Sequence, residues 1–252
     1  MYKISDYPEI QNNFYLTGKN CGASKKLLGN VSILTVFVKQ RENDWSEDTK
    51  NRYYKCMRNA TAWLEKEAKR YGARLKINCV HLETSVSERA DARKGFELLK
   101  NYFHTSSMQK LHTYYEQSLN VDEIPIIMAF EREGRSFAYK QCSCRKETVQ
   151  EQTVIFFNKN SRWMAETIAH ELLHQFGAAD YYYPDSVKAI ARRYFGKSLM
   201  LDLDSPVLDD LSAYVVGWKD TISAASYWFL RETNWMTMER SDREIDLQWK
   251  SS

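Results

Sequence analysis

Residues 170–180 contain the side chains of this chain that are best suited to chemistry, and they read H-E-L-L-H-Q-F-G-A-A-D. His170 and His174 are four residues apart, so on a helix both imidazoles lie on one face and can bind one metal ion. Glu171, beside the first histidine, can take a proton from a water at that metal. The spacing therefore predicts a metal centre with a general base next to it.

Gly177 and Asp180 extend this motif past the end of the predicted helix. A glycine three residues after His174 can adopt a left-handed conformation, end the helix and turn the chain back. Such a turn would bring Asp180 to the metal as a third ligand. Three protein ligands leave one position open for water, which is the layout of a catalytic zinc site. From ligand type and motif we expect one Zn²⁺ ion as the cofactor.

The residues around the motif predict the helix that must carry the two histidines. Apolar residues recur at helical spacing and form one stripe, while His170, Glu171 and His174 fall outside it. The helix therefore buries one face and presents the ligands on the other. The alternative is an amphipathic helix with two surface histidines, and the glycine and aspartate at fixed offsets argue against it. The stripe consists of Ala165, Ile168, Ala169, Leu172, Leu173 and Phe176.

The pattern H-E-x-x-H-x-x-G-x-x-D resembles the metzincin clan of zinc peptidases, in the variant that has aspartate at the last position. The resemblance implies a zincin-like fold, zinc held by the two histidines and Asp180, and Glu171 as the general base. It also implies a methionine turn beneath the metal. Residues 198–202 lie about where that turn should be, and Met200 is its candidate methionine.

This chain departs from the family pattern in two ways. Several metzincins have a tyrosine two residues after the methionine that assists at the metal, whereas this chain has Asp202 there. Metzincins are also mostly secreted, yet the first residues here lack the apolar core of a signal peptide. Help from a tyrosine would have to come from elsewhere, and the candidates are Tyr181, Tyr182, Tyr183 and Tyr214.

Apolar patterns before the motif predict strands that alternate with helices. Strands joined through helices form a mostly parallel sheet. The expected fold is therefore α/β (α+β) and zincin-like, with a mixed, mostly parallel sheet and helices in an upper lobe, a smaller helical lower lobe, and an active-site cleft between them. The predicted strands are 31–38, 75–82, 124–130 and 153–158. One predicted helix runs from a capping box at Asp44 and Glu47 to Gly72, and a second lies around residues 96–103.

After Asp180 the strand signals stop, and helices are expected at 185–195, from Ser205-Pro206 through Val216, and at 221–232. Residues 1–29 show no clear period and are interpreted as an irregular lead-in. We expect residues 30–252 to form a single metzincin-like catalytic domain, with its upper lobe at about 30–177 and its lower lobe at about 178–252. In the family, an edge strand pairs with extended substrate, and the segment from Arg135 to Gln152 would hold that edge.

The composition excludes some classes of function. The formal charge is +3 and the basic residues are dispersed, which argues against nucleic-acid binding. No apolar run approaches the roughly 20 residues of a membrane span. Five cysteines at irregular spacing favour free thiols, and with the absence of a signal peptide they predict a cytoplasmic protein. They are Cys21, Cys56, Cys79, Cys142 and Cys144.

The leading hypothesis is a zinc-dependent endopeptidase with a peptide or protein substrate. One alternative is a zinc-binding module that recognises a peptide without cutting it. Another is a zinc peptidase of a different clan, whose third ligand is Asp185 or a residue beyond Met200. An active cytosolic endopeptidase would also need restraint, and the sequence identifies no regulatory partner.

Overall fold

The computed structural model describes residues 1–40, 45–86, 91–140 and 151–236. Its centre is a five-stranded sheet with the strand order β2-β1-β3-β5-β4. Every pairing is parallel except that of β4 with β5, which is antiparallel. The predicted mixed, mostly parallel sheet is thus confirmed. The strands are β1 (Gly29–Gln40), β2 (Leu75–Val86), β3 (Ile126–Phe130), β4 (Phe137–Tyr139) and β5 (Gln152–Phe156).

The long strand β1 shows why the sheet needs helices on both faces. Its residues from Val31 to Val38 are all buried. Because side chains alternate along a strand, Ile33 and Phe37 enter one hydrophobic core, while Leu34 and Val36 enter a second core on the opposite face. A continuous apolar run is the pattern expected of a strand covered on both sides.

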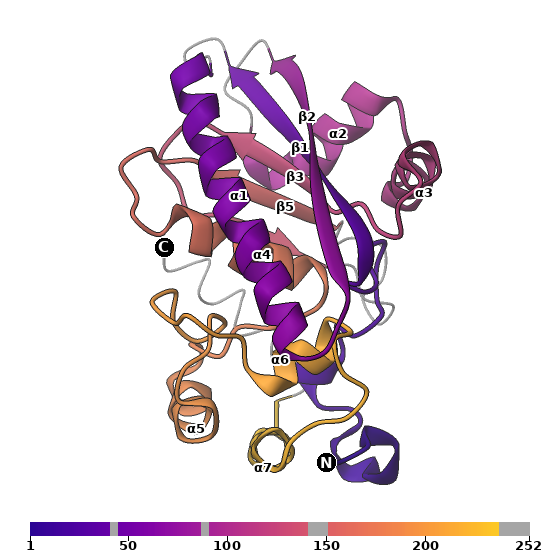
Figure 1. The fold of residues 1–252 in the computed structure, drawn as a ribbon, viewed down its shortest axis with the longest axis vertical. Helices are drawn as coiled ribbons and strands as arrows, with labels where there is room; N and C mark the ends of the chain where they lie inside the picture. Colours follow the sequence, from indigo (N-terminus) through magenta and orange to yellow (C-terminus); the bar gives the residue numbers. More distant parts are fainter. Residues whose placement is uncertain (41–44, 87–90, 141–150, 237–252) are drawn as a thin grey trace.

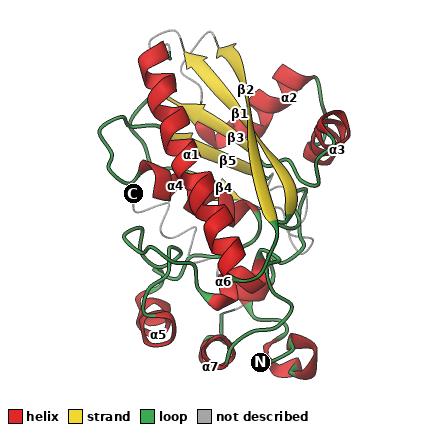
Figure 2. Cartoon of the chain, viewed as in Figure 1, coloured by secondary structure: helices red, strands yellow, loops and turns green. Residues whose placement is uncertain are grey.

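Helices supply those two covers (Figures 1 and 2). On one face lie α1 (Glu47–Arg70) and α4 (Met164–Gln175), which pack against each other. On the other face lie α2 (Gly95–Phe103) and α3 (Met108–Leu119). The cover by α1 and α4 positions the motif, because α4 carries His170, Glu171 and His174.

Several element boundaries differ from the sequence prediction for local reasons. Ser46 caps α1, and its hydroxyl accepts a hydrogen bond from the Thr49 amide at 3.1 Å. Asp44, the residue predicted for that cap, lies outside the described residues. A second helix, α3, follows α2, because left-handed His104 ends α2 and Ser107 caps the next helix.

In the lower part of the molecule the regular elements are helices, as predicted, and loops join them (Figure 1). One of them begins later than expected: Asp209, rather than Ser205, caps it by accepting a hydrogen bond from the Ser212 amide at 2.8 Å. Pro206 instead offers its carbonyl to the Trp63 indole on α1 at 3.0 Å. The helices are α5 (Asp185–Phe195), α6 (Asp210–Val215) and α7 (Ala224–Glu232).

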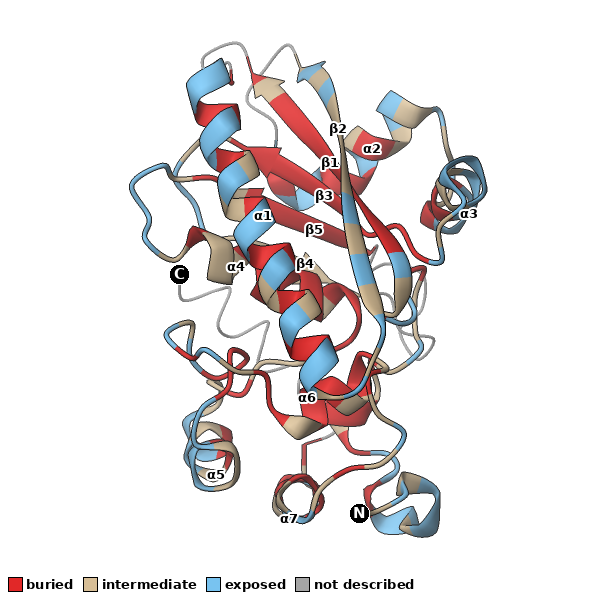
Figure 3. Cartoon of the chain, in the orientation of Figure 1, coloured by how far each residue is buried: buried red, intermediate tan, exposed pale blue. Residues whose placement is uncertain are grey.

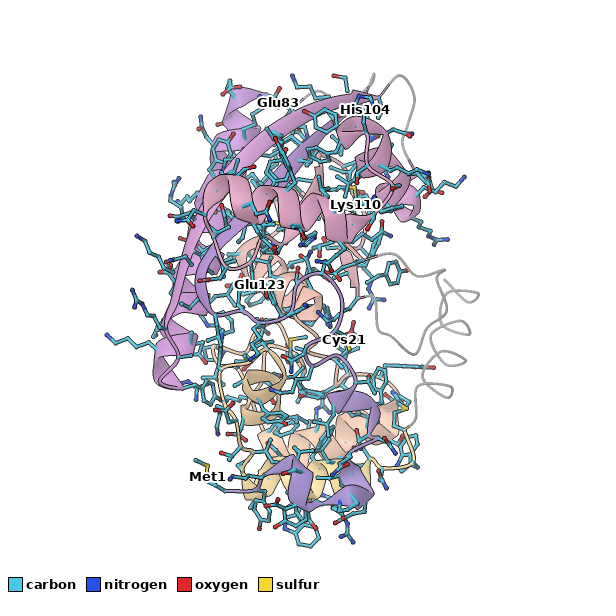
Figure 4. The ribbon with its side chains drawn as sticks, turned by 90° about the vertical axis from the view of Figure 1, so that its right-hand side faces the viewer. Met1, Cys21, Glu83, His104, Lys110 and Glu123 are labelled. Carbon is cyan, nitrogen blue, oxygen red and sulfur yellow. The ribbon has the colours of Figure 1, made fainter. Side chains whose placement is uncertain are left out.

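The N-terminal segment, predicted as an irregular lead-in, forms three short 3-10 helices and packs on these lower helices. Tyr2 pairs with Ile222 just before α7, and the side-chain Nδ2 of Asn13 donates to the Leu230 carbonyl at 2.9 Å. Met1 accordingly lies at the opposite end of the molecule from Glu83 and His104 (Figure 4). The division into a lead-in and two lobes stays a prediction. The 3-10 helices are η1 (Ile4–Asp6), η2 (Pro8–Ile10) and η3 (Phe14–Leu16), and a fourth, η4 (Ala92–Lys94), precedes α2.

Two buried carboxylates then hold the chain where it rises from the lower helices to β1. Glu151 accepts hydrogen bonds from the amides of Ala23 and Ser24 at 2.8 and 3.1 Å. Glu123 accepts from the amides of Lys25 and Lys26 at 3.1 Å. Residues 23–26 are therefore fixed to the sheet by side chains far away in sequence.

Three cysteines in the described part of the chain, Cys21, Cys56 and Cys79, are free thiols. Cys142 and Cys144 lie outside the described residues, as does most of the segment predicted to hold the edge strand. Among its described residues, those of β4 lie at an edge of the sheet. None of the described helices combines the length and the apolar character needed to cross a membrane.

Candidate metal centre

Helix α4 carries the first three residues of the motif and buries the predicted stripe. Ile168, Leu172 and Leu173 are at most 1% exposed in the core shared with α1. His170 and Glu171 are also buried, each 6% exposed, whereas His174 is partly exposed. Figure 3 shows most of α4 in the colour of buried residues, behind α1. The ligands thus lie in a well-packed environment that restricts their side chains.

Helix α4 ends in a turn that carries the chain toward Asp180. Gly177 has a φ of +99°, in the left-handed region. Its amide donates to the His174 carbonyl at 2.9 Å, and the Ala178 amide donates to the Leu173 carbonyl at 3.1 Å. These two hydrogen bonds are those of a Schellman motif with glycine at C′. The turn predicted from Gly177 is therefore present, and it reverses the chain within three residues of Asp180.

Three side-chain atoms meet beyond this turn. The His170 Nε2 and His174 Nε2 atoms are 3.0 Å apart. The Asp180 Oδ1 atom lies 3.0 Å from the first and 3.1 Å from the second. Ligand atoms about 2.0–2.1 Å from a tetrahedral zinc ion are separated by about 3.3 Å. The triangle is therefore close to one face of a zinc tetrahedron, and the group can hold a metal ion.

Backbone carbonyls orient both imidazoles. The His170 Nδ1–H donates to the Leu199 carbonyl at 3.1 Å, and the His174 Nδ1–H donates to the Ala178 carbonyl at 2.7 Å. A histidine that donates from Nδ1 keeps a lone pair on Nε2, and such bonds are the usual outer support of metal-binding histidines. Both lone pairs therefore point toward Asp180.

The convergence of these atoms fits a cation. Two Nε2 lone pairs and a carboxylate oxygen repel one another at about 3 Å unless a positive charge lies between them. The Asp180 Oδ1 atom is buried, and among the described residues only the imidazoles of His170 and His174 lie within hydrogen-bond distance of it. Burial lowers the pKa of His174, but Asp180 outweighs this effect and raises it to about 9, so the site favours a positive charge at this point, which is a proton without metal and the metal ion itself once it displaces that proton. The donor set, two neutral imidazoles and one carboxylate, suits zinc.

Glu171 lies beside this group without being part of it. Burial raises the pKa of its carboxyl above the usual range, and His170 and His174 oppose that effect. Its Oε2 atom is buried and has no hydrogen-bond partner in the described chain. A buried carboxylate with a raised pKa and a free oxygen is suited to accept a proton.

Residues 198–202 form the turn in which Met200 was predicted to lie beneath the metal. The amides of Leu201 and Asp202 both donate to the Ser198 carbonyl, at 3.0 and 2.9 Å. Met200 is fully buried, and its carbonyl accepts from the Tyr181 amide at 3.0 Å. The turn therefore holds the site at two points, through the hydrogen bond from His170 to the Leu199 carbonyl and that from Tyr181, the residue after Asp180, to the Met200 carbonyl. The role of Met200 as the family's methionine stays a prediction.

The structure ranks the four tyrosines that were candidates to assist at the metal. Tyr182 is the one at the site: its ring stacks on His170, and its hydroxyl accepts from the Arg135 Nη2 at 2.8 Å. Burial, and then the charge of Asp180, raise the pKa of Tyr182 well above its usual value. Tyr181 is buried and bonds Asp209 instead. Tyr183 precedes Pro184, and Tyr214 packs under Lys19.

Sequence reasoning missed two residues that bear on the site. Arg135 was noted only as the start of a predicted edge segment. Gly18 was not singled out, yet its backbone lies against Gly177 so closely that a Cβ at Gly18 would be 2.3 Å from the Gly177 carbonyl oxygen. No local pattern marks either residue, because each reaches the site through folding of distant segments. Asp185, the alternative third ligand, is exposed at the start of α5 and outside the group of three.

No family model matches the sequence, and no curated protein matches it. Among solved structures, the chain is similar to OgpA from Akkermansia muciniphila, with 12% identity over 82% of this chain and 66% of that chain, at a TM-score of 0.46. It is also similar to metalloproteinase-II from Bacteroides fragilis, with 12% identity over 89% of this chain and 60% of that chain, at a TM-score of 0.38. The chain spans less than two thirds of the length of either protein.

Proposed function

We propose that this chain is a zinc-dependent hydrolase of peptide bonds, with His170, His174 and Asp180 as metal ligands. The observation that carries the proposal is the convergence of three electron-pair donors within 3.1 Å of one another, with Glu171 adjacent. The finer assignment, to the aspartate variant of the metzincin clan, rests on the motif and on the supporting turn that contains Met200.

A bound zinc ion would supply Lewis acidity, which polarises a carbonyl and lowers the pKa of water. The residues of the chain then have distinct tasks. Glu171 accepts the proton of the attacking water and returns it to the leaving amine nitrogen. Leu199 and Ala178 hold the imidazoles in the tautomer that binds metal. The apolar side of α4 keeps this arrangement rigid, which limits the reorganisation needed during the reaction.

The sharpest test replaces Glu171 with glutamine. Glu171→Gln keeps the size of the side chain but cannot accept the proton, so zinc content should stay at one ion per chain while turnover falls by about 10²–10⁴-fold. Zinc is measured by elemental analysis, and turnover with a mixed library of unstructured peptides followed by mass spectrometry. Wild-type cleavage rates in Glu171→Gln would refute the mechanism.

The same experiment addresses the alternative of a recognition module. Wild-type protein that holds zinc and binds library peptides, yet never cuts them, would favour recognition without hydrolysis. Glu171 favours hydrolysis over recognition alone, because its carboxylate interacts with the three proposed ligands and its Oε2 atom has no hydrogen-bond partner among the described residues.

A further inference from the structure

Arg135 brings a positive charge to the edge of the metal centre. It lies just before β4, the antiparallel edge strand that packs against α4. The residue is exposed, yet its guanidinium is held in place by the bond from its Nη2 to the Tyr182 hydroxyl. It interacts electrostatically with both Asp180 and Glu171. An exposed cation is thus fixed beside the proposed reaction site.

The charges at the site do not balance once a metal is bound. A divalent ion carries two positive charges, which Asp180 and Glu171 neutralise, since the histidines are neutral when they bind metal. The charge of Arg135 is then left over. A partly buried site with surplus positive charge attracts anions, and the low dielectric strengthens that attraction.

The guanidinium also has unused donors. Arginine carries five N–H groups in a planar fork that matches a carboxylate. The hydrogen bond to Tyr182 uses one of them, and the described chain shows no other hydrogen-bond or ion-pair partner for Arg135. Tyr182 in turn is supported by its stacking on His170, with the ring centroids 6.5 Å apart. The fork is therefore pre-oriented, so little side-chain entropy is lost when a ligand binds.

We propose that Arg135, steadied by Tyr182, binds a carboxylate of the substrate next to the bond that is cut. This inference rests on the proposed function and adds a substrate class to it: peptides with an acidic side chain, or a free C-terminus, close to the scissile bond. Arg135 is then a specificity-determining residue. If it served only to hold Tyr182 and Asp180 in position, its loss would affect all substrates alike.

A binding test separates these roles without relying on turnover. The probes are hydroxamates, which bind zinc directly, with tails of two to five methylenes that end either in a carboxylate or in its methyl ester. With zinc-loaded protein, the carboxylate should bind about tenfold more tightly than the ester at the best tail length. In Arg135→Gln that ratio should fall to about 1, and in Arg135→Lys it should be intermediate because the fork is lost.

Arg132 offers a matched control, because it comes from the same loop but bonds Gln40 and packs on Phe130 and Phe156. Arg132→Gln should retain the wild-type ratio. A ratio near 1 in wild-type protein would overturn the inference and leave the metal centre intact. If Arg135→Gln weakened the binding of both probes equally, or lost zinc, the inference would also be overturned, and Arg135 would have a positioning role. Failure of the wild type to bind zinc would refute the proposed function itself.

Peptide pairs then distinguish the two sources of carboxylate. One pair differs only by glutamate or glutamine beside the cleavage site, with the C-terminus amidated, and the other differs only by a free or amidated C-terminus. Binding is measured by calorimetry with the zinc-loaded Glu171→Gln protein. If the protein prefers the glutamate peptide to the glutamine peptide, and Arg135→Gln abolishes this preference, the bound carboxylate is an acidic side chain. If it instead prefers the free C-terminus to the amidated one, the bound carboxylate is the chain end. Equal affinity within both pairs would overturn the inference.

Discussion

The contact between Gly18 and Gly177 makes a testable link between the N-terminal segment and the metal centre. A Cβ added at Gly18 would lie 2.3 Å from the Gly177 carbonyl oxygen and 2.7 Å from its Cα. Even a contact of 3.0 Å requires a displacement of about 0.7 Å, several times the roughly 0.2 Å tolerance of metal–ligand distances. Gly177 immediately precedes Ala178, whose carbonyl orients His174.

We therefore expect Gly18→Ala to act on both stability and metal binding. Overpacking of this kind costs about 1–3 kcal/mol of unfolding free energy. Loss of the hydrogen bond that orients a metal-binding histidine weakens metal affinity by about 10–100-fold. Unfolding is followed by denaturant titration, and zinc affinity by competition with a chelator, on protein shown to be folded by circular dichroism.

Gly72→Ala is the control for this experiment. Gly72 has a φ of +76° but no atom within 4 Å of an added Cβ, and it lies at the end of α1. Its substitution should cost about 1–2 kcal/mol through backbone strain and leave zinc affinity unchanged. Wild-type zinc affinity in Gly18→Ala, or an equal loss of affinity in Gly72→Ala, would refute the reasoning that the N-terminal segment sets the geometry of the turn.

Two further predictions address the third ligand and the effect of pH. Asp180→Ala should lose most of its zinc in elemental analysis, whereas Asp185→Ala should retain it; the reverse result would move the third ligand to Asp185. His112 is fully buried on α3, its ring nitrogens have no hydrogen-bond partner among the described residues, and burial lowers its pKa to about 4. The unfolded chain therefore takes up a proton at about pH 6.5 that the folded chain does not, and stability should fall from pH 6.5 toward pH 4 by at most about 3 kcal/mol. The difference in unfolding free energy between wild type and His112→Phe isolates this effect, with exposed His104→Asn as the control, and a difference that is constant across this range of pH would contradict it.

The sequence predicted the sheet because local periodicity records burial. The apolar run from Val31 to Val38 forms a strand covered on both faces, and its neighbours alternate with helices as expected. Helix starts were harder to predict, because the start depends on which side chain accepts hydrogen bonds from the backbone amides of the first turn. Ser205 was such an error, because Asp209 accepts from the Ser212 amide and starts the helix instead.

The motif itself carried most of what could be predicted about the site. The spacing of His170 and His174 requires only an α-helix to place both rings together, and the conformation that glycine favours is enough to predict the turn at Gly177. These properties are local, so the amino-acid sequence by itself determined them.

Tertiary structure decided the rest. Leu199 orients His170, Gly18 packs against the turn, and Arg135 meets Tyr182, each from a segment distant in sequence. Such contacts depend on how the sheet, α4 and the lower helices pack together, and no period or spacing in the chain encodes them. The sequence thus determined the helix, its turn and the types of ligand. Packing decided the tautomers of the two histidines, the distances between the ligand atoms and the charged groups around them.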